Sequence, residues 1–334
     1  MPNPFETNAL GSSGLSVSQL SLGAAPLGNL LNKVSEEEAL LTIEEALNSG
    51  INYVDTAPFY GYGLSEERIG RSLPQLSSRP LISTKVGKLI RPGVREGNEL
   101  FGDRQPFYLA NLDKRFIFDF SYDGVLRSHE ESLQRLGVDA VDILHIHDSD
   151  EHFTDAVQGA YQALNRLREE GSIKAVSAGM NQWEMLSKFL DHGDFDCFLL
   201  AGRYTLLDQS SLAELLPKCL KHGTSIVIGG VYNSGILANP VPGTTYNYVE
   251  APQDLIDRAL AMDVICQRHG VPLKAAALQF PLGHPSVATV LTGVRSCEEW
   301  QENLRLFELE IPRDLWLELR EESMVGPEVP LPGD

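Results

Sequence analysis

The chain has 334 residues, 43% of them hydrophobic, which is enough to bury a large core. Lysine and arginine number 27 against 46 aspartates and glutamates, so the formal net charge is −19. That charge argues against nucleic acid or an anionic membrane surface as a partner, and it suits a small uncharged substrate.

The cysteines and the N-terminus indicate a cytoplasmic protein. Cys197, Cys219, Cys266 and Cys297 lack the spacing of a zinc site or a disulfide framework, so we expect neither a metal nor a disulfide. Residues 1–11 have neither the basic nor the apolar segment of a signal peptide. No apolar run is long enough to span a bilayer, so we expect no membrane partner.

Short apolar segments alternate with amphipathic segments along the chain, after a predicted hairpin over residues 7–18. The predicted strands are residues 19–23, 50–55, 81–86, 141–147, 173–178, 195–200, 224–229 and 287–292. The predicted helices are residues 35–50, a segment from about 65, 123–136, 155–170, 182–190, 210–221, 253–282 with a break at 270–272, and 296–307. Most strands are apolar throughout, as parallel strands covered on both faces are. This alternation predicts one domain over residues 1–334, a (β/α)8 TIM barrel in the α/β class.

Two long connections interrupt the alternation. Residues 88–122 are rich in aromatic side chains, and residues 231–252 contain several tyrosines. Irregular connections of this length are unusual unless they form a lid or a binding loop, so we expect long active-site loops. No glycine-rich nucleotide-binding fingerprint of the Rossmann or P-loop type follows a predicted strand.

Asp55 ends the second predicted strand, and a loop rich in proline and glycine carries Tyr60 just beyond it. In parallel α/β proteins the chemistry usually lies at the carboxyl ends of the strands. On this segment alone, an aspartate that caps the next turn and a half-buried tyrosine explain the pattern equally well.

A barrel would bring Asp55 and Tyr60 together with Lys85 and His147, which lie near the ends of the third and fourth strands. A lysine in a buried strand needs a partner, and Asp55 on the neighbouring strand is the obvious one. A buried ion pair beside a satisfied histidine would explain three of these residues but not Tyr60. A tyrosine has a pKa of about 10, and an adjacent ammonium would lower it toward the range of proton transfer. We therefore predict an active site.

The segments around these four residues resemble the catalytic tetrad of the aldo-keto reductase family. They read DTA at 55–57 with Tyr60, STK at 83–85 and DILHIH at 142–147, and the resemblance covers nearly the whole chain. Further stretches resemble the bacterial aldose 1-dehydrogenase branch, which includes L-fucose, D-threo-aldose and pyridoxal 4-dehydrogenases. These stretches are residues 25–29, 120–124, 201–207 and 233–235.

The resemblance implies a role for each tetrad residue. Tyr60 would be the proton donor or acceptor, Lys85 and Asp55 its tuning pair, and His147 the group that orients the substrate oxygen. NAD or NADP would lie extended across the barrel mouth.

The resemblance also implies cofactor contacts, with departures from the family pattern. Ala201 stands where many members have a glutamine, and Gly229 or Gly230 stands where an aromatic ring often stacks on the nicotinamide. Tyr232 is the expected substitute for that ring. The cofactor-binding residues carried over are Asn181, Tyr232, Ser234, Gly235, Gly293, Arg295, Glu299, Glu302 and Asn303. The resemblance places Glu302 and Asn303 against the adenine, whereas without it they would be read as a solvated helix face.

The expected activity is oxidation of the anomeric carbon of an aldose to its lactone, with a sugar of the L-fucose, L-galactose or D-arabinose type. Pyridoxal oxidation is the alternative, because its cyclic hemiacetal presents the same local chemistry. A non-catalytic cofactor-sensing subunit is a third interpretation, which the complete tetrad disfavours. Carboxylates at Glu298 and Glu299 would repel a 2′-phosphate more than Arg295 would attract it, which predicts a preference for NAD. The expected assembly is a monomer or homodimer.

Overall fold

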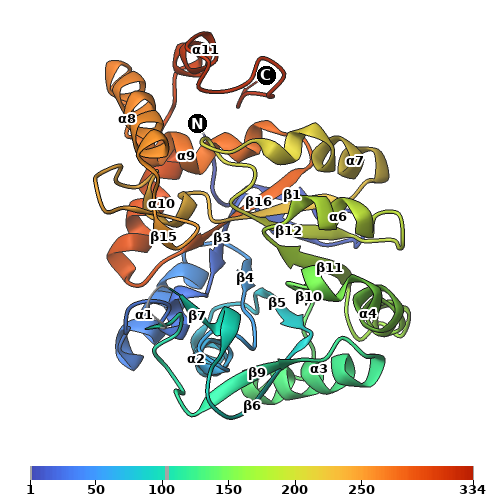
Figure 1. The fold of residues 1–334 in the computed structure, drawn as a ribbon. Coiled ribbons are helices and arrows are strands. Elements are labelled where there is room, and N and C mark those ends of the chain that lie inside the picture. The colour runs from blue at the N-terminus through green and yellow to red at the C-terminus, as the bar shows by residue number, and fades with distance from the viewer. Residues whose placement is uncertain (1, 102–104, 334) are drawn as a thin grey trace.

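Eight parallel strands form a closed barrel in the computed structural model, which describes residues 2–101 and 105–333. The strands follow chain order around the barrel, and the last pairs with the first (Figure 1). They are β3 (Leu20–Gly23), β4 (Tyr53–Asp55), β5 (Leu81–Val86), β10 (Ile143–His147), β11 (Ala175–Met180), β12 (Cys197–Ala201), β13 (Ser225–Gly229) and β16 (Val287–Gly293). The predicted (β/α)8 barrel is confirmed.

A helix follows each barrel strand and covers the outside of the barrel (Figure 1). The ends of these helices follow local signals: the Ser35 hydroxyl accepts a hydrogen bond from the Glu38 N–H at 3.1 Å, and Gly137 ends α3 with φ of 64°. The helices are α1 (Glu36–Asn48), α2 (Leu64–Ser72), α3 (Tyr122–Leu136), α5 (Gln162–Glu169), α6 (Trp183–Phe189), α7 (Leu215–His222), α9 (Leu273–Gln279) and α10 (Cys297–Glu308).

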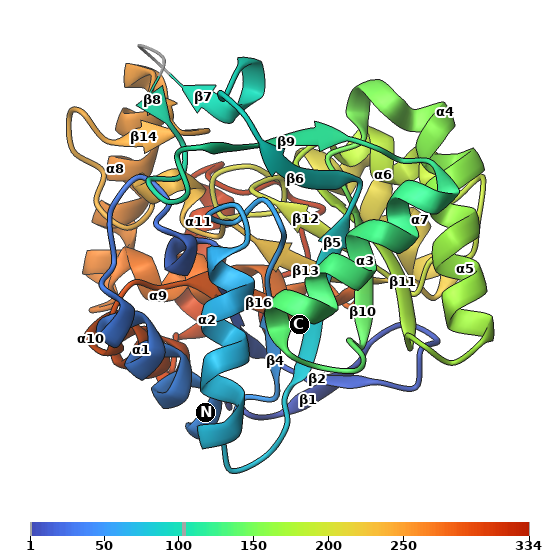
Figure 2. The same ribbon diagram turned by 90° about the horizontal axis from the view of Figure 1, so that it is seen from below.

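The predicted N-terminal hairpin is present and closes one end of the barrel. Its strands β1 (Thr7–Ala9) and β2 (Ser16–Ser18) pair antiparallel. Leu10 and Val17 are fully buried against side chains of the barrel interior, including Ile143. Figure 2 shows this hairpin at the end of the barrel opposite the long loops.

The connection over residues 88–122 is not irregular, so this part of the expectation was wrong. It carries two small antiparallel sheets that lie beyond the carboxyl ends of the barrel strands (Figure 2). The paired strands are β6 (Lys88–Pro92) with β9 (Lys114–Phe118), and β7 (Leu100–Phe101) with β8 (Gln105–Pro106). Residues 102–104 of this predicted loop lie outside the described ranges.

Two buried charged side chains hold this segment in place. Arg95 lies 3.7 Å from the centroid of the Tyr62 ring, and Glu99 accepts hydrogen bonds from the Tyr62 hydroxyl and the Phe116 N–H, each at 2.9 Å. The Arg95 guanidinium also donates to the main-chain carbonyls of Tyr108, Ala110, Asn111 and Lys114. Hydrogen bonds made by these two buried side chains therefore hold the segment together.

The second long connection also contains a hairpin, made of β14 (Thr245–Tyr246) and β15 (Val249–Glu250). Tyr248 lies between these strands, and its ring packs edge-on against Phe107 with the centroids 5.7 Å apart. The two long loops, although distant in sequence, therefore touch each other over the barrel mouth.

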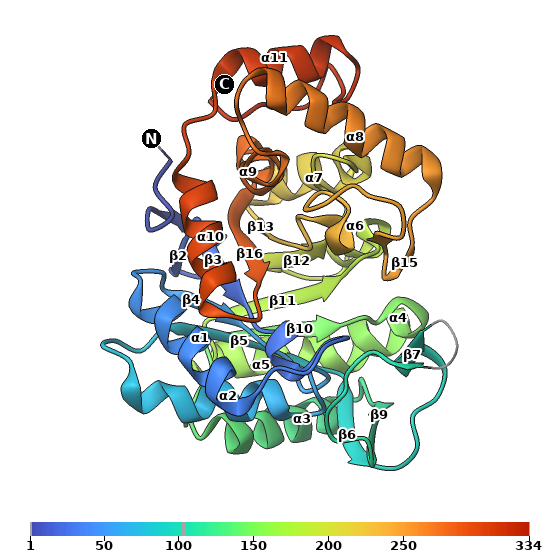
Figure 3. The same ribbon diagram turned by 90° about the vertical axis from the view of Figure 1, so that its left-hand side faces the viewer.

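The helical predictions needed two changes, and one predicted break is confirmed. The segment predicted as one helix over 155–170 contains α4 (Phe153–Asp155) and a π-helical stretch (Ala156–Tyr161) before α5. The break predicted at 270–272 separates α8 (Gln253–Arg268) from α9. An unpredicted helix, α11 (Arg313–Glu321), packs on α8 outside the barrel (Figure 3). Within the described ranges, no helix has the length and apolar character needed to cross a membrane.

We predict that Arg95→Met loosens the segment over residues 105–118, because it removes the donor from four carbonyls, and each buried unpaired acceptor costs about 1–3 kcal/mol. Amide hydrogen exchange in this segment should accelerate at least about tenfold, while the barrel strands keep their protection. Arg127→Met, at an exposed arginine on α3, is the control. Unchanged exchange in Arg95→Met would show that Arg95 does not hold the segment.

Candidate active site

A layer of polar side chains crosses the barrel interior just below its open end. Strand side chains alternate between the two faces, so Tyr53 and Asp55 both point inward from β4. The strand register places Asp55 opposite Ser83, and Lys85 opposite His145. The sequence therefore fixes which polar groups meet once the barrel closes.

Lys85 and Asp55 form a fully buried ion pair, as predicted. The Lys85 Nζ lies 2.6 Å from Asp55 Oδ2, and it also donates to the Thr56 carbonyl at 2.8 Å. The Ser83 hydroxyl donates to the other carboxylate oxygen, Oδ1, at 2.6 Å, and the Tyr53 hydroxyl lies 2.8 Å from Ser83 Oγ. Burial raises the pKa of Asp55 and lowers that of Lys85, and their mutual contact opposes both changes.

Tyr60 lies against this ion pair, with the Lys85 Nζ 4.6 Å from its ring centroid. Its pKa is raised well above the usual value, first by burial and then by the negative charge of Asp55. The expectation that Lys85 would lower this pKa was wrong, because burial and the neighbouring Asp55 charge raise it. At neutral pH Tyr60 is therefore protonated and ready to donate.

His147 completes the predicted tetrad. Its ring is 6.1 Å from the Tyr60 ring and nearly perpendicular to it. Burial, together with the nearby Lys88 ammonium, lowers the pKa of His147 well below its usual value, so the imidazole is neutral. A neutral imidazole has one N–H donor to offer to a substrate oxygen. The structure brings all four predicted residues together at one end of the barrel.

Aromatic rings from both long loops surround the tetrad. The Tyr108 ring lies 6.0 Å from the Tyr60 ring, and Phe59 packs on Tyr108 and Phe116 at 5.0 and 5.1 Å. Tyr248 extends this cluster from the other loop through Phe107. The open end of the barrel therefore has apolar walls with a few hydroxyl groups among them, as small-molecule sites commonly do.

An ion pair that we had not predicted lies beside His147. The Lys88 Nζ is 2.5 Å from Asp148 Oδ2, and that oxygen is 3.4 Å from His147 Nε2. Lys88 follows Lys85 by three residues, and Asp148 follows His147 directly. A buried lysine needs an acidic partner, so the same argument that we used for Lys85 predicts one for Lys88. The sequence does not show that this partner is Asp148.

The comparisons with known proteins identify the family. The model of the aldo/keto reductase family matches residues 19–322. The chain belongs to the aldo/keto reductase family. It is 43% identical to pyridoxal 4-dehydrogenase of Microbacterium luteolum, over 96% of this chain and 98% of that protein. It is 39% identical to D-threo-aldose 1-dehydrogenase of a Pseudomonas species, over 95% and 97% of the two chains.

Solved structures support the fold. The holo form of an aldo-keto reductase from Bacillus halodurans matches with a TM-score of 0.72 at 23% identity, over 97% of this chain and 98% of that one. Glycerol dehydrogenase from Gluconobacter oxydans matches with a TM-score of 0.74 at 20% identity, over 99% and 98%. Aldo/keto reductases use NAD(P)H, so the residues carried over for cofactor binding can be placed on this aldo/keto reductase barrel.

Tyr232 and Asn303, which were assigned to opposite ends of the cofactor, touch each other. The Tyr232 hydroxyl donates to Asn303 Oδ1 at 2.9 Å. In an extended dinucleotide the nicotinamide and adenine ends are far apart, so this contact argues against opposite ends for the two side chains. The contact favours placing both side chains at the same end.

Three of the charged candidates on and before α10 are in ion pairs. Arg295 lies 2.6 Å from Glu299 Oε1, and the Arg295 N–H donates to Glu299 Oε2 at 2.8 Å. Glu302 accepts two hydrogen bonds from Lys274, at 3.0 and 2.9 Å. The opposing charges of Arg295 and Glu299 are joined in one ion pair.

The remaining candidates lie at or just after the ends of barrel strands. Asn181 follows β11 with a partly exposed side chain, and Gly293 ends β16 and is exposed. Ser234 and Gly235 follow β13 in a short 3-10 turn with positive φ values of 61° and 115°. These positions put backbone groups at the same end of the barrel as the tetrad.

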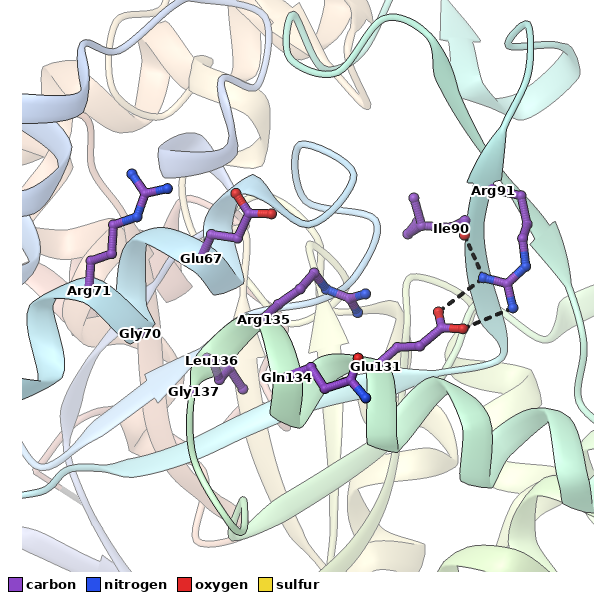
Figure 4. A pocket seen from close by; sticks show the side chains of 10 residues that line it. All are labelled: Glu67, Gly70, Arg71, Ile90, Arg91, Glu131, Gln134, Arg135, Leu136 and Gly137. Atoms are coloured by element: carbon purple, nitrogen blue, oxygen red, sulfur yellow. Dashed lines mark hydrogen bonds and ion pairs between the residues drawn. The ribbon is translucent and has the colours of Figure 1, made fainter.

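A hollow of about 700 Å³ on the outside of the barrel is not part of this site. It lies between α2, α3 and β6 and is lined by charged side chains including Glu67, Arg71 and Arg135 (Figure 4). Arg91 and Glu131, which also line it, form an ion pair at 3.0 Å. Because the tetrad residues do not line it, we assign no chemistry to this hollow.

We predict that Tyr60→Phe lowers kcat by about 10²–10⁴-fold, because it keeps the ring over Lys85 and removes only the hydroxyl. Cofactor affinity, followed by quenching of protein fluorescence, should be retained. Tyr122→Phe, at an exposed tyrosine, is the matched control. A folded Tyr60→Phe protein with turnover within a few-fold of the wild type would remove Tyr60 from the chemistry.

Proposed function

We propose that this aldo/keto reductase oxidises the anomeric carbon of an aldose to its lactone. The observation that carries the proposal is the 2.6 Å Lys85–Asp55 ion pair with Tyr60 and His147 beside it at the open end of the barrel. The 39% identity to a D-threo-aldose 1-dehydrogenase supports an aldose as the substrate. Sugars of the L-fucose, L-galactose or D-arabinose type are the proposed class.

The roles of the four side chains follow from their protonation states. His147 is neutral and donates an N–H to the oxygen on the reacting carbon, which orients the sugar. Tyr60 takes the hydroxyl proton as the carbon–oxygen double bond of the lactone forms. Lys85, whose charge is balanced by Asp55 in the resting protein, stabilises the phenolate of Tyr60 that accepts this proton. Because the pKa of Tyr60 is raised, oxidation should become faster as the pH increases.

A nicotinamide dinucleotide, when bound, supplies the hydride acceptor for this oxidation. The exposed Gly293 and the positive-φ turn at Ser234 and Gly235 fit such a ligand, because main chain without bulky side chains can approach it closely. Asn181 would hold the nicotinamide amide. Arg295, Glu299, Glu302, Asn303 and Tyr232 would lie at the adenosine end.

Oxidation of pyridoxal is the second candidate. The relative with 43% identity is a pyridoxal 4-dehydrogenase, and the aromatic walls formed by Tyr108, Phe107 and Tyr248 would suit a flat ring. The cyclic hemiacetal of pyridoxal would be oxidised by the same side chains. A non-catalytic cofactor-sensing subunit remains a third proposal, disfavoured by the complete tetrad.

A substrate panel separates these functions. We predict that at least one of L-fucose, L-galactose and D-arabinose reduces NAD+ at alkaline pH, followed by NADH absorbance, and yields a lactone detected as its hydroxamate. Tyr60→Phe gives the background rate. Oxidation of pyridoxal without any aldose would favour the second candidate. Cofactor binding without turnover of either class would favour the sensing subunit.

We predict that NAD+ is preferred over NADP+ by about tenfold or more, because Glu299 occupies Arg295 and adds negative charge where a 2′-phosphate would lie. Glu299→Gln should free Arg295 and shift the ratio of kcat/KM values toward NADP+. Glu308→Gln removes the same charge from an exposed residue at the other end of α10 and is the control. A wild type that prefers NADP+, or an unchanged ratio in Glu299→Gln, would exclude Glu299 as the determinant.

A further inference from the structure

The Lys88–Asp148 ion pair is built into the wall of the active site. Lys88 is only 3% exposed, and its Nζ lies 4.6 Å from the Phe59 ring centroid, 5.0 Å from Phe116 and 5.8 Å from Phe118. The three rings leave the ammonium little freedom, and its hydrogen bond goes to Asp148 Oδ2 at 2.5 Å. One carboxylate oxygen is therefore fixed by an immobile cation.

The main chain also fixes Asp148. Its φ is +46°, a left-handed conformation that a residue other than glycine adopts only where the surroundings impose it. Its N–H donates to the Gly179 carbonyl at 3.1 Å, which ties it to the end of β11. In this conformation one carboxylate oxygen of Asp148 lies beside the His147 ring.

The second oxygen of Asp148 is free. The side chain is 37% exposed, and Oδ1 accepts no hydrogen bond from the residues that the structure describes. Burial opposes ionisation, but Lys88 and His147 lower the pKa of Asp148 to about 2. At neutral pH the free oxygen can therefore accept a hydrogen bond and has no proton to donate.

The position of the Asp148 carboxylate beside His147 suggests which donor its free oxygen accepts from. Asp148 Oδ2 is 3.4 Å from Nε2 of His147, the residue that would hold the reacting oxygen in the proposed function. Neighbouring oxygens on adjacent carbons of a sugar are about one hydrogen-bond length apart. A hydroxyl on the carbon next to the reacting carbon would therefore come within reach of Asp148.

We propose that Asp148, held by Lys88, is a specificity-determining residue that accepts a hydrogen bond from the hydroxyl on the carbon adjacent to the reacting carbon. It selects aldoses and other α-hydroxy aldehydes over carbonyl compounds that lack this hydroxyl. The inference rests on the proposed function only for the placement of the reacting oxygen between Tyr60 and His147.

The test compares two three-carbon aldehydes, D-glyceraldehyde and propionaldehyde, in the reductive direction with NADH or NADPH. The ratio of their kcat/KM values measures selection of the hydroxyl. Asp148→Asn, which keeps the shape and removes the charge, should lower this ratio by about 10- to 100-fold, as expected for loss of a hydrogen bond to a charged group. Hydration of the aldehydes cancels when the ratio is compared between proteins.

Two further variants sharpen the test. Lys88→Met keeps the aliphatic stem among the rings and should lower the ratio in the same direction, because the carboxylate loses the contact that orients it. Asp155→Asn makes the same chemical change at a side chain that is 70% exposed, and the ratio should not move. An unchanged ratio in Lys88→Met would overturn the role of Lys88.

The inference and the proposed function can fail separately. A wild type without preference for glyceraldehyde, or an unchanged ratio in Asp148→Asn, would overturn the role of Asp148 whether or not aldoses are oxidised. If no aldose is oxidised but the preference exists and depends on Asp148, the inference stands and the aldose 1-dehydrogenase proposal fails.

Discussion

The buried ion pair between Lys85 and Asp55 is the constraint on which the site depends. Removing one partner from such a pair leaves an uncompensated buried charge, at a cost of about 3–5 kcal/mol, so each residue requires the other. Their strands are neighbours, and a hydrogen-bonded chain through Ser83 to Tyr53 continues the polar layer inside the barrel. The pairing of β4 with β5 therefore sets the position of the ion pair against which Tyr60 packs.

A second ion pair, Lys88–Asp148, repeats this arrangement one step further from the barrel interior. In both pairs the ammonium is buried. The carboxylates differ, because Asp55 is enclosed whereas Asp148 keeps an exposed edge. The inner pair acts on Tyr60, and we assign the outer pair to the substrate. Two of the three aromatic rings around Lys88, Phe116 and Phe118, come from the long loop after β5, and Phe59 comes from the loop after β4, so Lys88 joins these two loops at the barrel mouth.

The sequence was sufficient to predict the site residues that lie at strand ends. It was insufficient to predict contacts between segments that are far apart in the chain. Asp55, Lys85 and His147 could be placed because parallel strands end at one edge of the barrel. The β6–β9 hairpin was missed because residues 93–113 separate its strands, so no short turn marks the pairing. The pKa of Tyr60 was predicted in the wrong direction because a sequence does not show how deeply a side chain is buried. The contact of Tyr232 with Asn303 likewise depends on how a loop meets α10.

The hairpin that closes the other end of the barrel has a consequence for the order of events. With Leu10 and Val17 sealing that end, the tetrad is approached from the side of the long loops. Two ligands that share one entrance obstruct each other, so the one that lies deeper must enter first and leave last. The architecture thereby favours an ordered catalytic cycle, in which departure of the deeper ligand and any movement of the covering loops compete with the chemistry to limit turnover.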